Sequence, residues 1–220
     1  MAIELGASRL MAPYFSSSQI VWTVIIGTIM IAMALGNIIG GRLADKNPDP
    51  SRLYMRLLIA AIWTAAIPFA GRYLIMGISL LLATFVTKNF LIWASFVTCF
   101  VVFVFPLILL GTVTPSLVKF SVDNLDDNGK TVGELGALNT IGSIIGTFMP
   151  TFVTIPAVGT AATFIIFSSI LAILSILYFL SIRKKLIKVA IAAVLIVALS
   201  FTTANYSFAF WEDNVIHEDE

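Results

Sequence analysis

Long stretches without a single charged residue constrain this chain more than any other feature of its sequence. Residues 20–41 carry no charge, and neither do residues 89–118 or residues 135–182. About 20 apolar residues suffice for a helix to cross the hydrocarbon core of a bilayer. A backbone in lipid must satisfy its own hydrogen bonds, which favours helix over open strands. The sequence therefore predicts an all-α integral membrane protein.

The composition supports this class and excludes several others. Hydrophobic residues make up 59% of the chain and charged residues 11%, against about 45–50% and about 25% in soluble domains. A net charge of +1 offers no field for nucleic acid. Cys99 and His217 are the single residues of their kinds, so an internal disulfide and a multi-histidine metal centre are excluded. No glycine-rich nucleotide loop occurs either. We expect no catalytic residue, no cofactor and no metal in this chain, and the lipid bilayer as its surroundings.

The apolar runs predict a polytopic bundle of about six or seven segments over residues 1–203. Pro156–Gly159 is expected to divide the longest run into two spans by a tight turn. Met1–Tyr14 resembles the second half of a helix, too short to span alone. Tyr73–Thr87 is also short, and it suits an interfacial helix, a re-entrant helix or a short span. Residues 204–220 are predicted to form an aromatic and then acidic tail.

Two basic clusters govern the expected orientation. One surrounds the loop after the first long run, from Arg42 to Arg56, and the other is Arg183–Lys188. Loops rich in Lys and Arg stay in the cytoplasm. Both clusters satisfy this rule only if Tyr73–Thr87 does not cross the membrane. The sequence leaves both orientations of the tail open.

Two G-x-x-x-G motifs lie in uncharged spans. They pair Gly36 with Gly40 and Gly142 with Gly146. Small residues four apart let helix backbones approach closely. Packing within the bundle is the simplest use of both motifs, and dimerisation or a substrate path are the alternatives.

A few polar residues lie within or beside the apolar segments. Glu4 and Arg9 are the most notable, because a charge inside a bilayer is costly and marks a functional site by default. Glu134 is a candidate partner for Arg9, and the alternative is that Glu4 and Arg9 lie near the water interface. Asn37 and Asn139 accompany the two glycine motifs in short stretches that resemble each other, Ala34–Asn37 and Ala137–Asn139.

The segment Gly41–Lys46 ends the first long run with alternating charges. It resembles the loop between the second and third helices of major facilitator transporters. In that family, acidic and basic groups there bridge helices on the cytoplasmic face, which the resemblance implies for Arg42 and Asp45. A topology signal with a helix cap is the alternative interpretation.

Several motifs together resemble the membrane region of bacterial membrane-embedded spermidine synthase-like proteins. Each motif alone is short, but the set covers most of the chain. The matching segments are Met1–Phe15, Trp22, Ala34–Asp45, Leu110–Pro115, Thr140–Phe148, Ile155-Pro156 and Gly159. The chain departs from the family pattern at Ser16, where glycine is usual.

The resemblance implies a membrane region without the catalytic domain of the family. In that family a soluble aminopropyltransferase domain follows the helices and uses decarboxylated S-adenosylmethionine with a polyamine acceptor. Its catalytic residues match no position here, so none is transferred. We expect a membrane domain or subunit of the bacterial cytoplasmic membrane that anchors such a soluble domain or supplies its polyamine. The alternatives are a polyamine-like transporter related to half of a major facilitator unit, and a purely structural anchor.

Overall fold

The computed structural model describes residues 1–15, 18–85, 90–121, 128–182 and 186–206. Every regular element within these residues is a helix, which confirms the all-α prediction. In chain order the elements are α1 (Ala2–Phe15), α2 (Gln19–Lys46), α3 (Pro50–Phe85), α4 (Phe90–Cys99), η1 (Phe100–Val104), α5 (Phe105–Gly111), α6 (Val113–Ser121), α7 (Asn128–Met149), η3 (Pro150–Thr154), α8 (Ile155–Ile182) and α9 (Leu186–Tyr206).

Long apolar helices make the chain a multi-pass membrane protein. Among the described residues, four stretches are long and apolar enough to cross a bilayer, namely Gln19–Lys46, Pro50–Thr84, Phe90–Ser121 and Gly129–Ile182. The last stretch is two spans, because Gly159 has φ 81° and ψ 170° and breaks the helix. Few residues other than glycine tolerate such a φ. This break falls within the predicted turn at Pro156–Gly159.

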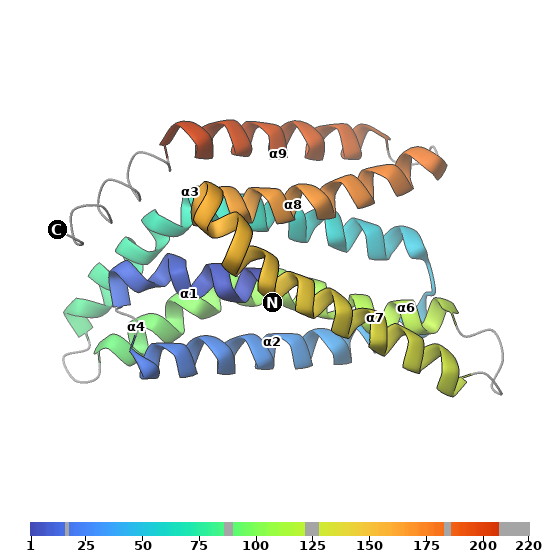
Figure 1. Ribbon diagram of the computed structural model, residues 1–220, viewed down its shortest axis with the longest axis horizontal. Coiled ribbons are helices and arrows are strands. Elements are labelled where there is room, and N and C mark those ends of the chain that lie inside the picture. The colour runs from blue at the N-terminus through green and yellow to red at the C-terminus, as the bar shows by residue number, and fades with distance from the viewer. Residues whose placement is uncertain (16–17, 86–89, 122–127, 183–185, 207–220) are drawn as a thin grey trace.

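Helix α3 resolves the uncertain segment Tyr73–Thr87. It runs without interruption through 36 residues from Pro50 to Phe85, so Tyr73–Phe85 continues an existing span and makes no separate crossing. As a result, the junctions α2–α3, α6–α7 and α8–α9 all lie at one end of the bundle (Figure 1). Both basic clusters lie beside those junctions in the sequence, which is the arrangement that the positive-inside rule favours for two clusters on the same side of a membrane.

A π-helical segment interrupts the third long span just before Pro106. Proline lacks an N–H, so the carbonyl of Val102, four residues earlier, loses its intrahelical donor. The indole Nε1–H of Trp63 donates to this carbonyl at 3.0 Å. Neighbouring side chains commonly satisfy backbone groups that proline frees inside a membrane, and here the bond also joins α3 to η1.

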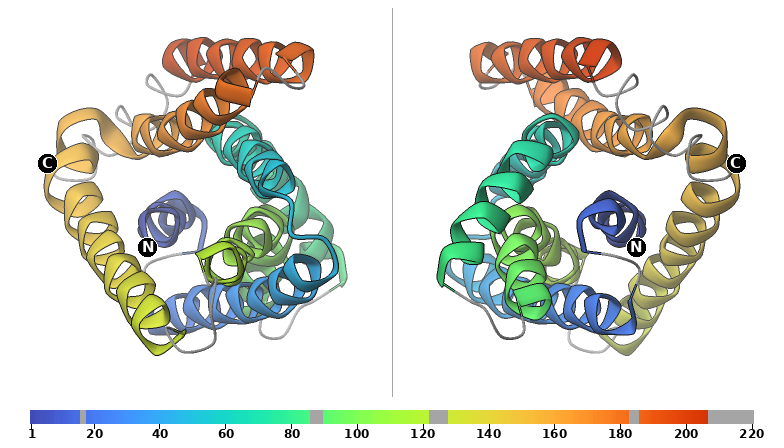
Figure 2. Two further views of the ribbon diagram at one scale, coloured as in Figure 1. Left: turned by 90° about the vertical axis from the view of Figure 1, so that its right-hand side faces the viewer. Right: turned by 90° about the vertical axis from the view of Figure 1, so that its left-hand side faces the viewer.

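Helix α1 lies in the centre of the bundle. It contacts α2, α3, α4, α7, η3 and α8, and Figure 2 shows it surrounded by a ring of the other helices. Its buried side chains, Ile3, Ala7, Leu10, Met11 and Phe15, belong to the main core cluster. Helix α9 lies outside the ring against α3 and α8. A short central helix thus organises the packing of much longer ones.

Candidate functional site

The first glycine motif forms the closest helix contact of the site. A Cβ atom at Gly36 would lie 2.5 Å from the carbonyl oxygen of Ile108 and 2.9 Å from Cα of Gly111. A Cβ at Gly40 would lie 2.6 Å from Cα of Thr112. Helix α2 therefore approaches α5 and the start of α6 at a distance that only glycine permits. This motif packs within the bundle, as its simplest interpretation predicts.

The second glycine motif behaves differently. A Cβ at Gly142 would meet no atom within 4 Å, and one at Gly146 would lie 3.6 Å from Cβ of Met1. No residue in 129–149 is buried. Within the described part of the chain, internal packing therefore does not account for Gly142.

The charged residues of α1 lie apart from other charges. Arg9 is exposed and Glu4 is half-buried. Glu134, the candidate partner of Arg9, is exposed on α7, and no ion pair joins the two among the described residues. Glu4 likewise has no ion-pair partner there. The spacing of residues in the sequence does not show how each helix is oriented about its axis. This orientation decides which charged side chains on different helices meet.

One ion pair links helices at the basic end of the bundle. Lys119 Nζ of α6 lies 3.1 Å from Asp45 Oδ1 of α2. The side chains are 49% and 71% exposed, so the pair is solvated and weak, about 0–1 kcal/mol. Arg42 is exposed on the turn before Asp45 and joins no ion pair in the described residues. The charged loop thus bridges α2 and α6 through Asp45.

The two asparagines lie on the surfaces of their helices. Asn37 and Asn139 are both exposed, and neither has a hydrogen bond to a described residue. The two asparagines do not meet in the fold, because helices α2 and α7 are not packed against each other. The candidate polar residues therefore do not assemble into one site in the described structure.

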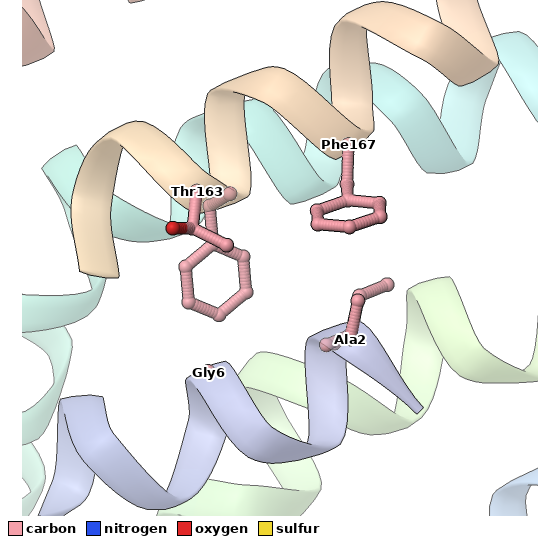
Figure 3. Close-up of a pocket in the computed structure, with 6 residues that line it drawn as sticks. Ala2, Gly6, Thr163 and Phe167 are labelled. Carbon is pink, nitrogen blue, oxygen red and sulfur yellow. The ribbon is translucent and has the colours of Figure 1, made fainter. Parts of the chain in front are cut away.

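A small apolar pocket lies between α1 and α8 (Figure 3). Thr163 and Phe167 of α8 face Ala2 and Gly6 of α1. A Cβ at Gly6 would lie 2.7 Å from two ring atoms of Phe164, so glycine is needed for this contact. The sequence analysis missed it, although Gly6 lies between the two charges that it singled out. Six residues line the pocket: Ala2, Ile3, Gly6, Thr163, Phe164 and Phe167. None of them is charged, so the pocket offers no carboxylate to a polyamine.

Among the described residues, no three His, Cys, Asp or Glu side chains lie close enough together to hold a metal ion. Two hydroxyls, Thr28 Oγ1 and Thr98 Oγ1, are buried without a hydrogen-bond partner there. Both belong to helices that contact each other, α2 and α4.

Comparison with known proteins returned no match, whether against protein-family models, curated proteins or solved structures. Four of the segments singled out in the sequence contact each other in pairs in the fold. Ala34–Asp45 packs on Leu110–Pro115 through Gly36 and Gly40, and Met1 lies against Gly146 of the Thr140–Phe148 segment.

Proposed function

We propose that this chain is the membrane-embedded part of a bacterial spermidine synthase-like protein. In this role it holds a soluble aminopropyltransferase domain or subunit at the cytoplasmic membrane and performs no transferase chemistry itself. The observation that supports the proposal is the contact between two of the motif segments, Ala34–Asp45 and Leu110–Pro115, at the α2–α5 crossing.

This contact explains why the motif residues are of these types. Gly36, Gly40 and Gly111 bring backbones together, and none of them carries a reactive group. Catalytic sites instead gather titratable residues with convergent geometry, and no group of three His, Cys, Asp or Glu side chains gathers in the described part of this chain. A structural role in the membrane accounts for the motifs with fewer assumptions than a reaction does.

An activity assay on the purified chain tests the proposal. The full chain in nanodiscs is incubated with decarboxylated S-adenosylmethionine and putrescine, and aminopropyl transfer is followed by product formation. We expect no turnover above that of nanodiscs holding an unrelated helix bundle. Turnover by the chain alone contradicts the proposal.

Transport of a small polyamine is the second candidate, favoured by Glu4 on the central helix. This carboxylate is half-buried and has no ion-pair partner among the described residues, and a charge in such a place marks ion or substrate pathways. Labelled putrescine uptake into proteoliposomes tests it, with Glu4→Gln as the variant and Glu134→Gln, at an exposed position on α7, as the matched control. Uptake that only Glu4→Gln abolishes supports transport, and the absence of uptake by the unmodified chain excludes it.

A further inference from the structure

Arg56 of α3 carries a half-buried charge that no other described residue neutralises. Its Nε donates to the backbone oxygen of Arg52 at 3.2 Å, and its Nη1 is buried without a hydrogen-bond partner among the described residues. The third nitrogen, Nη2, is not enclosed in this way. A charged group that loses water without gaining a partner is costly. An anion that reaches Nη2 from the surface would offset this cost.

A second arginine lies one turn earlier on the same side of α3. Arg52 is exposed, and it joins no ion pair in the part of the chain that the structure describes. Arg52 and Arg56 are close enough for their charges to repel each other. Asp49 precedes them and accepts a hydrogen bond from the backbone N of Ser51 at 2.9 Å, but no ion pair joins it to either arginine in the described residues. An anion between the two guanidinium groups would be attracted by both.

The two arginines lie where a spanning helix passes the lipid headgroups. Helix α3 starts at Pro50, at the end of the bundle that holds the α2–α3, α6–α7 and α8–α9 junctions (Figure 1). Arg56 follows about 9 Å further along the helix axis. Arginine side chains near the end of a span extend to the headgroups. The anion available at this depth is a lipid phosphate, with which a guanidinium pairs through parallel hydrogen bonds.

An apolar strip continues from the arginines toward the middle of the bundle. Ile59 and Trp63 follow Arg56 at spacings of three and four residues, so they share its side of α3. Both are exposed, and the Trp63 ring centroid lies 4.8 Å from that of Phe105, which is exposed as well. The hydrogen bond from Trp63 to Val102 O holds the indole in this position. An acyl chain attached to a phosphate at Arg56 can run along this strip, which a free phosphate would leave uncovered.

We propose that Arg52 and Arg56 bind the phosphate of an anionic phospholipid whose acyl chain lies along Ile59, Trp63 and Phe105. A headgroup with a net negative charge is favoured over a zwitterionic one, because a headgroup ammonium would bring a further cation to the two arginines. The lipid bridges α3 and α5, which contact each other, and therefore stabilises the bundle. This site does not depend on the function proposed above.

Lipid titration of the purified chain tests the site. The full chain in a neutral detergent is titrated with phosphatidylglycerol, phosphatidylcholine or inorganic phosphate, and the rise in Tm gives an apparent affinity. The site variants are Arg52→Gln and Arg56→Gln, and the matched control is Arg42→Gln. Arg42 is an exposed arginine of α2 that joins no ion pair among the described residues. Circular dichroism before the titration checks the helix content of each variant.

Phosphatidylglycerol should raise Tm at lower concentrations than phosphatidylcholine does. Arg52→Gln and Arg56→Gln should each weaken the apparent affinity for phosphatidylglycerol about tenfold, as expected for the loss of a charge-assisted hydrogen bond, whereas Arg42→Gln should leave it unchanged. Arg52 is exposed, so its variant decides the matter even if Arg56→Gln does not fold.

Three results overturn the proposal. The first is an equal loss of affinity in all three variants, or no loss in either site variant. The second is phosphatidylcholine binding as tightly as phosphatidylglycerol. The third is a rise in Tm with inorganic phosphate that depends on the same two arginines, because the site would then hold a free anion and no lipid.

Discussion

Replacing Gly36 by alanine should push helix α2 away from helix α5, because the backbones of the two helices are in contact at this position. The added methyl group would lie 2.5 Å from the carbonyl oxygen of Ile108 and 2.9 Å from Cα of Gly111. Both atoms are backbone atoms, so neither can move aside as a flexible side chain can. Overpacking of this kind typically costs about 1–3 kcal/mol. For a chain of this size, each kcal/mol corresponds to roughly 2–4 °C in Tm.

The second motif supplies the matched control. Gly142→Ala adds the same methyl group to the same motif, but that group would meet nothing within 4 Å. We expect Gly142→Ala to be neutral or to stabilise by up to about 1 kcal/mol, because alanine favours helix over glycine. Thermal unfolding in detergent micelles, followed by circular dichroism, measures both variants. Equal Tm shifts for the two variants would refute the packing described for α2 and α7.

Four further substitutions test individual interactions by the same unfolding measurement. Trp63→Phe should destabilise by about 1–2 kcal/mol, because Val102 O then loses its donor; an unchanged Tm would contradict this. Thr98→Val should be neutral or slightly stabilising, since its hydroxyl has no partner in the described residues, and a large loss would reveal one. Asp45→Asn and Lys119→Gln should each lower the free energy of unfolding by under about 1 kcal/mol, and by less at high salt. The double variant should lower it no more than either single variant does. Additive losses would argue against the pairing of Asp45 with Lys119.

Features that depend on local sequence were predictable. Uncharged runs define the spans because the cost of charge in a bilayer acts on each segment separately. The break at Gly159 follows from turn residues in an otherwise apolar run, and its φ of 81° explains why glycine stands there. The membrane class therefore follows from the sequence with little ambiguity.

Features that depend on neighbouring helices were not predictable in the same way. The two glycine motifs look alike in the sequence, yet Gly36 and Gly40 both lie against backbone atoms of the α5–α6 segment, whereas a Cβ at Gly142 would meet nothing within 4 Å. The sequence left the role of Tyr73–Thr87 open, but a single arginine, Arg72, does not stop a helix, and α3 continues to Phe85. The choice of Lys119 as the partner of Asp45 likewise depends on how α2 and α6 pack, which no local pattern records.

The proposed role is tested most directly by asking where aminopropyltransferase activity resides. The tagged chain is purified in native lipid particles from its own host membranes, and bound activity is compared with that on a matched, unrelated helix bundle. Our account predicts activity that co-purifies with this chain and that the chain alone in nanodiscs lacks. Activity intrinsic to the isolated chain, or activity that stays entirely in the soluble fraction, would contradict it.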